Sequence, residues 1–227
     1  MDADAGSSWD PQRCARELVR CLRPSPDEPP LPSLPLPDIE KLLGFSISLT
    51  NGGPGQGPQY PDAAAVKSAM TRLDCWRQCF ERVAQEPHDQ ALGDGLLSFW
   101  MAYGLCSVPC GLKDDIAVFA DALRRHLPPY RGPGMTLYRG QLESRNLAGV
   151  YGIAWTSRRR VARDFAARQA SLEQQQSVVL RIDAEPGRIV APPTEGSLWM
   201  DEHEYIIDPR GIQAVVVATI PAQSNPP

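Results

Sequence analysis

The sequence predicts an α+β protein, with helices first and a mostly antiparallel sheet assembly after them. Two observations predict this class. Residues 62–111 carry apolar side chains at the three- and four-residue spacing of amphipathic helices. After Pro133, short runs rich in β-branched and aromatic residues alternate with turn residues. Helices followed by a series of strands are typical of α+β proteins, and we divide the chain into residues 1–61, 62–132 and 133–227.

Composition and charge limit the class of protein. The chain has 227 residues, of which 42% are hydrophobic, enough for a real core. It carries 23 basic and 27 acidic residues, a net charge of −4, which argues against a nucleic-acid partner. No apolar run approaches the ~20 residues needed to cross a bilayer, and the acidic start "MDADAGSSWD" lacks the plan of a secretory signal. We therefore expect a soluble protein with no membrane partner, cytoplasmic in the cell that makes it.

The first region, residues 1–61, combines one helix with a proline-rich arm. Asp10 can cap a helix that begins at Pro11, and Leu18 and Leu22 are one helical turn apart. Seven prolines in segment 23–38 favour an extended polyproline conformation. This arm serves as a spacer or, in the alternative, recruits a proline-binding partner. A short helix, "DIEKLLG", and a glycine-rich loop follow.

Three helices are predicted in the second region, residues 62–132. The first is long, with one apolar stripe made by Val66, Met70, Leu73, Trp76, Phe80 and Val83. The second, "QALGDGLLSFWMAYGL", is apolar on most sides and is expected to be buried. The third, "DDIAVFADALRRHL", is acidic first and basic last, as the helix macrodipole prefers. The aromatic residues Trp76 and Phe80 indicate core packing rather than a cofactor site.

All six cysteines lie in the first half of the chain, in three pairs: Cys14 and Cys21, Cys75 and Cys79, Cys106 and Cys110. Without a secretory signal, reduced thiols are favoured over disulfides. Cys75 and Cys79 are one turn apart and share a helix face. Zinc sites, however, usually show tighter Cys-x-x-Cys pairs with histidine partners. The sequence therefore predicts plain buried thiols and no metal.

Six strands and one helix are predicted in the third region, residues 133–227. The strand runs are "MTLYRG", "YGIAWTS", "SVVLRID", "GRIVA", "EHEYIID" and "IQAVVVATI". The helix, "RRRVARDFAARQAS", places Val161, Ala162, Phe165 and Ala166 on its inner face. Its basic residues, Arg158, Arg159, Arg160 and Arg163, indicate a solvated face rather than a nucleic-acid patch.

Polar residues stand at the ends of the first two of these runs. Arg139 and Gly140 close the first, where an arginine can present its planar fork to phosphate and a glycine lets a ligand approach the backbone. Thr156 and Ser157 close the second, directly before the helix. A helix cap by Ser157 is the simpler interpretation of that pair taken alone.

The run "EHEYIID" opens with two carboxylates, Glu202 and Glu204. Side chains two residues apart on a strand point the same way. Two carboxylates held that close repel each other, and an ordinary sheet gains nothing from the repulsion. Either both face water, or both face a substrate.

The order and spacing of these three places resemble the Arg–Ser–Glu class of mono-ADP-ribosyltransferases, the relatives of cholera toxin and of the clostridial binary and C3-like toxins. The resemblance covers residues 135–220, and its most specific element is Glu-x-Glu followed by an apolar strand and a Pro/Arg/Gly turn. It implies a core of two packed, mainly antiparallel sheets that binds NAD as co-substrate. It also implies transfer of ADP-ribose to a protein acceptor. Glu-x-Glu in this family goes with arginine acceptors, but the rule has exceptions, so threonine, nucleic acid or a small molecule stays open as the acceptor.

The resemblance implies a role for each of four residues. Glu204 stabilises the oxocarbenium-like transition state that forms when the nicotinamide–ribose bond breaks. Glu202 meets the acceptor and orients or deprotonates it. Arg139 clamps the pyrophosphate or ribose of NAD, and the backbone of Gly140 approaches the nicotinamide amide.

The middle motif departs from the family's Ser-Thr-Ser/Thr, because it reads Trp155-Thr156-Ser157. Either Thr156 or Ser157 replaces the first serine in orienting the catalytic glutamate, or the strand register differs by one. The loop "APPTEGSLWM" corresponds to the acceptor-recognition turn, in which Trp199 either contacts the acceptor or anchors the core. Phe165 packs inside or, in the alternative, stacks on nicotinamide.

Two other functions fit the same residues. One is an NAD glycohydrolase that passes ADP-ribose to water, and the other is a catalytically dead binding module on the same fold. The resemblance also suggests a bacterial toxin or effector delivered into a host or target cell, with an antitoxin or chaperone as a partner.

Overall fold

The structure, a computed structural model, describes residues 10–22, 70, 73–103 and 116–222. The chain divides into two compact units, residues 1–127 and residues 128–227. The proline-rich arm, the short helix "DIEKLLG", the glycine-rich loop, Cys106 and Cys110 lie outside the described residues.

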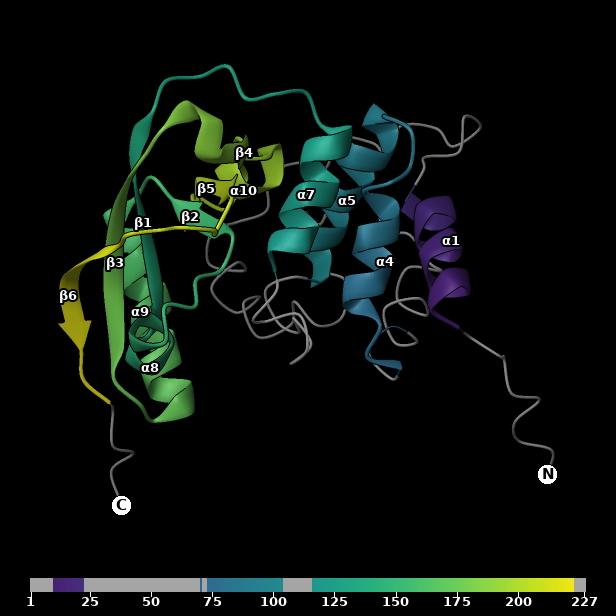
Figure 1. Ribbon diagram of the computed structural model, residues 1–227. Coiled ribbons are helices and arrows are strands. Elements are labelled where there is room, and N and C mark those ends of the chain that lie inside the picture. The colour runs from purple at the N-terminus through teal and green to yellow at the C-terminus, as the bar shows by residue number, and fades with distance from the viewer. Residues whose placement is uncertain (1–9, 23–69, 71–72, 104–115, 223–227) are drawn as a thin grey trace, which may run out of the picture. The chain divides into compact units, whose positions relative to one another are not determined.

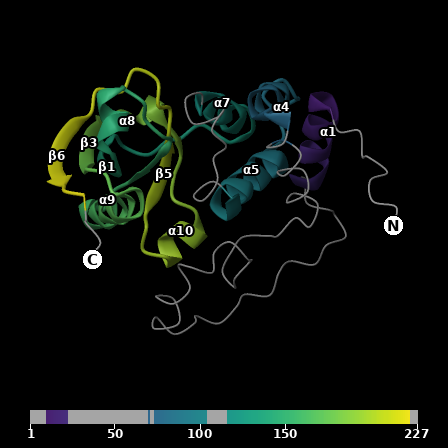
Figure 2. The ribbon, with the colours of Figure 1, turned by 90° about the horizontal axis from the view of Figure 1, so that it is seen from below.

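The first unit is helical in the residues that the structure describes. Its helices are α1 (Pro11–Leu22), α4 (Trp76–Val83), α5 (Gln90–Tyr103) and α7 (Ala117–His126). Helix α4 packs against both α1 and α7, and α5 packs against α1 and α7 (Figure 1 and Figure 2). The helices predicted around Leu18, Leu96 and Leu123 are therefore confirmed, and all three of these leucines are fully buried.

Helix α1 begins as its sequence predicts. The backbone N–H of Arg13 donates to the side chain of Asp10 at 2.5 Å. Asp10 therefore satisfies one of the backbone N–H groups that have no intrahelical partner in the first turn of a helix. Leu18 and Leu22, one turn apart, are both completely buried. The capping residue and the apolar spacing together account for this helix.

The long helix predicted through Leu73 and Trp76 is wrong. Asp74 has a φ of 47°, in the left-handed region, and α4 begins only at Trp76 with Cys75 as its N-cap. A left-handed residue cannot continue a right-handed helix. Leu73, placed on the apolar stripe by its spacing, is 43% exposed. The spacing of apolar residues continued across this break, which is why the pattern did not reveal it.

Aromatic side chains form much of the helical unit's core. Phe80 meets Phe119 edge to face, with ring centroids 4.8 Å apart, and Trp76, Phe99 and Trp100 surround this pair. Trp76 and Phe80 are 4% and 1% exposed, so the prediction that they pack in a core is confirmed.

The second unit contains one six-stranded antiparallel sheet, as the α+β class requires. Its strands are β1 (Met135–Leu142), β2 (Ala154–Thr156), β3 (Ser177–Ala184), β4 (Ile189–Ala191), β5 (Glu204–Ile207) and β6 (Val215–Ile220). In space they follow the order β4-β5-β2-β1-β3-β6 (Figure 1). Each strand falls within one of the six runs predicted from the sequence, extended by one or two residues for β1 and β3.

All six strands form one sheet whose two halves meet narrowly, so the expected pair of packed sheets is not confirmed. Strands β1 and β3 pair along their whole length, from Met135 opposite Ala184 to Leu142 opposite Ser177. Strands β1 and β2 share a single register pair, Tyr138 opposite Thr156. The halves β4-β5-β2 and β1-β3-β6 are thus joined by this one register pair. It lies next to the strand ends that hold the candidate site.

Helix α9 (Arg159–Glu173) covers one face of the sheet, where Ala162 and Ala166 pack on Val179. The opposite face carries the larger core cluster, which includes Trp155 and Leu180. Three short helices were not predicted: α8 (Glu143–Leu147), η1 (Pro186–Arg188) and α10 (Glu195–Trp199). In the part of the chain that the structure describes, no helix has the length and apolar character to span a membrane.

Candidate active site at the start of strand β5

Strand β5 begins at Glu204, and Glu202 lies before the strand. Asp201 and His203 both have left-handed backbone, with φ of 57° and 48°. The alternation of side chains along a strand therefore does not apply between the two glutamates, and our placement of both on one strand is wrong. A tight turn holds Glu202 near Glu204 instead.

Helix α10 holds this turn through Ser197. The Ser197 carbonyl accepts from the N–H groups of Glu202 at 2.9 Å and His203 at 3.3 Å. The Ser197 hydroxyl accepts from the N–H of Glu204 at 2.7 Å. Ser197 is completely buried, and Thr194 caps its helix by accepting from the Ser197 N–H at 3.2 Å. One serine thus binds three consecutive backbone N–H groups of the Glu-x-Glu turn.

The end of β2 holds the same turn from the other side. The Thr156 hydroxyl donates to the Glu202 carbonyl at 2.5 Å and accepts from the Arg158 N–H at 3.0 Å. The Ser157 N–H donates to the His203 carbonyl at 3.3 Å. Arg158, not Ser157, is the N-cap of α9, so the cap that we considered for Ser157 is wrong. Of the two candidates for the missing serine, Thr156 is the one whose hydroxyl positions the turn.

Trp155, at the position where the resemblance leads us to expect a serine, belongs to the core. It is 1% exposed, and its indole N–H donates to the Gly152 carbonyl at 2.9 Å. The alternation along β2 sends Trp155 to the large core cluster and Thr156 to the opposite face, opposite Glu204. The residues next to the turn are therefore Thr156 and Ser157.

The two carboxyl groups are held together at an electrostatic cost. Glu204 is 8% exposed, and Oε2 of Glu202 is buried with no hydrogen-bond partner among the residues described. Burial, together with the charge of Glu204, raises the pKa of Glu202 to about 7, and Arg168 opposes this shift. Neither carboxylate is simply solvated, so the solvent-facing alternative for the pair does not hold.

Arg139 leaves β1 on the face of the strand that is turned away from α9. Its neighbours Tyr138 and Gly140 both face α9, and side chains alternate along a strand. The guanidinium lies against Gly152 and donates to the Ala154 carbonyl at 2.5 Å. It also donates to the side chain of Gln141 at 3.1 Å. Arg139 therefore supports the strand ends around the site as well as carrying charge toward it.

The charge environment of Arg139 is mixed. Burial and the nearby cation Arg145 lower the pKa of Arg139 to about 10, while the carboxylate of Glu204 acts in the opposite direction. At neutral pH Arg139 is still a cation. Arg139 thus lies within electrostatic reach of one cation, Arg145, and of one carboxylate, Glu204.

The packing of α9 on β1 requires a glycine at position 140, which the sequence did not reveal. A Cβ at this position would lie 2.1 Å from the Ala162 carbonyl oxygen and 2.5 Å from the Ala166 nitrogen. Only glycine lets α9 approach β1 this closely. The direction that we assigned to a ligand is thus occupied by the helix.

The two aromatic candidates are both partly exposed. Phe165 lies on α9 with the guanidinium of Arg168 5.5 Å from its ring centroid, so it is not fully packed inside as the inner-face prediction required. Trp199 is the last residue of α10 and is likewise partly buried. Both rings remain accessible in part to a ligand.

The basic run at the start of α9 is solvated, as we predicted, and two of its arginines also form ion pairs. Arg158 and Arg160 form ion pairs with Asp201, at 3.2 Å and 2.8 Å. Both arginines are about half exposed or more, so these pairs contribute little stability individually. They do link α9 to the residue that precedes Glu202.

The structure brings together four of the eight predicted site residues: Thr156, Ser157, Glu202 and Glu204. Sequence reasoning missed Ser197, whose role depends on a helix of five residues within a segment assigned as a loop. The one local signal was Thr194, three residues before Ser197, at the spacing of a capping residue. Arg145 and Arg168 were missed because a single arginine on an exposed helix carries no distinguishing pattern.

Compared with known protein families, with curated proteins and with solved structures, this chain has no match.

Proposed function

We propose that the second unit is an NAD-dependent mono-ADP-ribosyltransferase that transfers ADP-ribose to a protein acceptor. The observation that supports this most is the pair Glu202 and Glu204, held together by Ser197 and Thr156 although their charges repel. A fold that keeps two carboxyl groups close against such a cost typically does so for function. In the finer form of the proposal, the two halves of the sheet correspond to the two sheets of the transferase core.

Glu204 is the group that meets the reacting sugar. Breaking the nicotinamide–ribose bond develops positive charge on the ribose ring, as in glycoside cleavage. A buried carboxylate that is already oriented stabilises this charge more strongly than a solvated one, because it needs no reorganisation during the reaction. Glu204 is buried, and its backbone is fixed by the Ser197 hydroxyl.

Glu202 is the group that meets the acceptor. A carboxyl whose pKa is about 7 exists in both protonation states near neutral pH, and a general base works best when its pKa lies near the working pH. Its buried Oε2 has no hydrogen-bond partner among the described residues, so an acceptor N–H or O–H that reached this oxygen would satisfy it. A cationic arginine acceptor would also relieve the repulsion between the two glutamates.

The other predicted residues complete the proposal. Arg139, with Arg145 beside it, supplies positive charge for the pyrophosphate of NAD. Phe165 is a surface for the nicotinamide ring, and Trp199 is a contact for the acceptor. In this proposal Gly140 contributes through the close approach of α9 rather than through a ligand contact.

The test is incubation of the full chain with NAD labelled in its adenylate part, alone and with lysates of bacterial and eukaryotic cells. Transfer predicts a discrete labelled macromolecule that is lost when Glu204→Gln replaces the wild type. Release of free ADP-ribose with no labelled product would instead make the protein an NAD glycohydrolase. No NAD turnover under either condition would leave a binding module and overturn the proposal.

The two glutamates provide a matched pair of variants. Glu204→Gln keeps the shape but removes the charge that meets the oxocarbenium, so transfer and hydrolysis should both fall about 100-fold or more. Glu202→Gln leaves that charge in place, so transfer should fall while slow hydrolysis survives. Equal loss of both reactions in both variants would contradict separate roles.

A further inference from the structure

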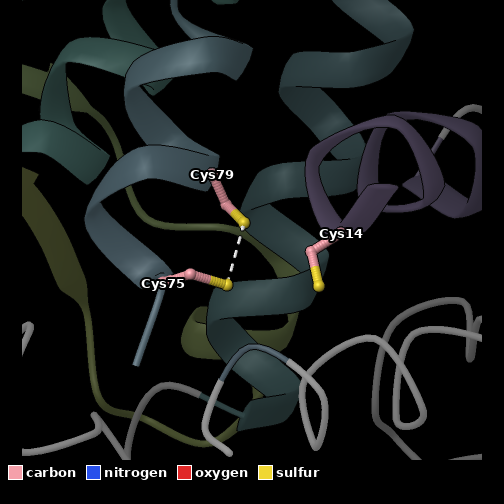
Figure 3. Close-up of side chains that lie close together, drawn as sticks. All are labelled: Cys14, Cys75 and Cys79. Atoms are coloured by element: carbon pink, nitrogen blue, oxygen red, sulfur yellow. Dashed lines mark hydrogen bonds between the residues drawn. The ribbon is translucent and has the colours of Figure 1, made fainter. Parts of the chain in front are cut away.

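Three cysteines that are far apart in the sequence meet in the helical unit. Cys14 lies in the first turn of α1, Cys75 is the N-cap of α4, and Cys79 lies one turn further along α4. Figure 3 shows the three side chains converging from the two helices. Their sulfur atoms all lie within 4.8 Å of one another, and those of Cys75 and Cys79 are 3.7 Å apart.

This group is removed from solvent. Cys14 and Cys79 are fully buried, and Cys75 is 1% exposed. Cys21, the other cysteine in the described residues, is also buried, but its thiol donates to the Leu18 carbonyl and it does not belong to the group. Burial alone therefore does not bring thiols together in this unit; the packing of α1 on α4 does.

We propose that Cys14, Cys75 and Cys79 bind a thiophilic cation, Zn²⁺. Three sulfur ligands of a tetrahedral zinc at ~2.3 Å lie about 3.8 Å from one another. Cys75 and Cys79 already have this separation, and Cys14 needs to move by no more than about 1 Å. Soft thiolates select zinc over hard cations such as Mg²⁺. The fourth position is left to an exogenous ligand, because no histidine or carboxylate joins the group within the described residues.

The charge of the proposed site suits its place at two helix N-termini. Three thiolates and one Zn²⁺ carry a net charge of −1, and helix N-termini stabilise negative charge and favour thiolates. Helix α1 has 12 residues and α4 has 8, and the N-cap Cys75 makes no side-chain cap hydrogen bond. The carboxylate of Asp10 near Cys14 acts in the opposite sense, since it disfavours a thiolate there.

Without metal, Cys14 and Cys79 are protonated thiols. Burial raises the pKa of Cys14 to about 11, and burial likewise raises the pKa of Cys79 above its ordinary value. Binding Zn²⁺ breaks three S–H bonds, forms three S–Zn bonds and releases three protons to solvent, with no change in oxidation state. A disulfide between Cys75 and Cys79 would instead need an oxidant and would leave Cys14 without a role. The inference does not depend on the proposed transferase activity.

The test uses the full chain, purified under reducing conditions and stripped of metal with a chelator. Co²⁺, as a spectroscopic substitute for Zn²⁺, should bind with one ion per chain and give sulfur-to-cobalt charge-transfer absorption. Zn²⁺ should then displace it. Replacing one ligand, as in Cys79→Ser or Cys14→Ser, should weaken binding by more than about 100-fold, which exceeds the typical effect of changing a group that only supports a ligand. Cys21→Ala, which removes a buried thiol outside the group, should bind as the wild type does.

Further measurements on the wild type and on Cys21→Ala test the proposal even if the variants of the proposed ligands do not fold. Zn²⁺ should raise the Tm of the wild type and of Cys21→Ala, because a ligand that binds only the folded state stabilises it. In the wild type, Zn²⁺ should also slow alkylation of Cys14, Cys75 and Cys79, located by mass spectrometry, more than that of Cys21. The proposal is overturned if Co²⁺ gives no sulfur charge-transfer absorption, if binding survives in the Cys14 and Cys79 variants, or if Cys75 and Cys79 are isolated as a disulfide.

Discussion

Glu202 is a residue at which the candidate site costs stability. Its folded pKa of about 7 lies above the ordinary value of 4.5, so the folded state resists ionisation of this carboxyl. Below about pH 4.5 the group is protonated in both the folded and unfolded states and costs nothing. As pH rises from 4.5 to 7, the unfolded state releases its proton first, and the free energy of unfolding falls.

Replacing this carboxyl should therefore stabilise the protein at neutral and alkaline pH only. Glu202→Gln should raise the free energy of unfolding by on the order of 2 kcal/mol at pH 8 and by little at pH 4. Urea denaturation at the two pH values measures this difference. Glu173→Gln, at an exposed position near the end of α9, is the control and should change stability little at either pH. A gain at pH 4 as large as that at pH 8 would contradict the assigned cause.

Arg139 combines a structural contact with the charge proposed for NAD. Arg139→Ala should weaken NAD binding by about 2–4 kcal/mol, because a charge-assisted contact to phosphate is lost. Isothermal titration measures the Kd, and circular dichroism checks the fold, since the guanidinium also donates to the Ala154 carbonyl. Arg131→Ala, at an exposed arginine of the same unit, should leave the Kd unchanged. An unchanged Kd in folded Arg139→Ala would remove Arg139 from the site.

Helix α10, although only five residues long, positions the Glu-x-Glu turn from one side. Ser197→Ala removes the acceptor of the buried Glu204 N–H, which should cost about 1–3 kcal/mol of stability. Because the catalytic carboxylate would then be less well oriented, we expect kcat for NAD cleavage to fall while KM changes little. This division between kcat and KM distinguishes a positioning residue from one that binds NAD.

The matched control lies on the same helix. Thr194→Ala removes the α10 cap but keeps the Ser197 hydroxyl, so it should lower stability with a smaller effect on kcat. If Thr194→Ala and Ser197→Ala lower kcat equally, the helix as a whole positions the turn and Ser197 has no special part.

For the molecule as a whole, two properties favour association between chains: an edge strand with exposed apolar residues and a small net charge. Strand β6 is at one end of the strand order, and its residues Val215 and Val216 are 53% and 45% exposed. Edge strands with exposed apolar residues favour pairing between chains. The isoelectric point of the sequence is about 5.4, so the repulsion that keeps chains apart disappears near that pH.

We therefore expect association near pH 5.4 that depends on β6. Light scattering at this pH should decrease when Val216→Lys places a charge on the edge. Leu172→Lys makes the same change of charge at an exposed apolar residue of α9 and serves as the control. If Leu172→Lys decreases scattering as much as Val216→Lys does, net charge alone causes the association.

The sequence determined the elements whose signals are local. Runs such as "SVVLRID" became strands and "RRRVARDFAARQAS" became α9, because β-branched density and apolar spacing act within one segment. The sequence also located Glu204 at the start of a strand, whereas its placement of Glu202 on the same strand is wrong. It did not reveal the break at Asp74, or the left-handed residues Asp201 and His203, because these backbone conformations are imposed by the surrounding packing.

Contacts between distant segments were decided only by the tertiary structure. Ser197 binds the Glu-x-Glu turn, α9 rests on Gly140, and Cys14 meets Cys75 and Cys79 only after the chain has folded. None of these pairs has a local pattern, because each side chain is ordinary within its own segment. Periodicity reports which face of an element is buried, while the partner that covers that face depends on how the whole unit packs.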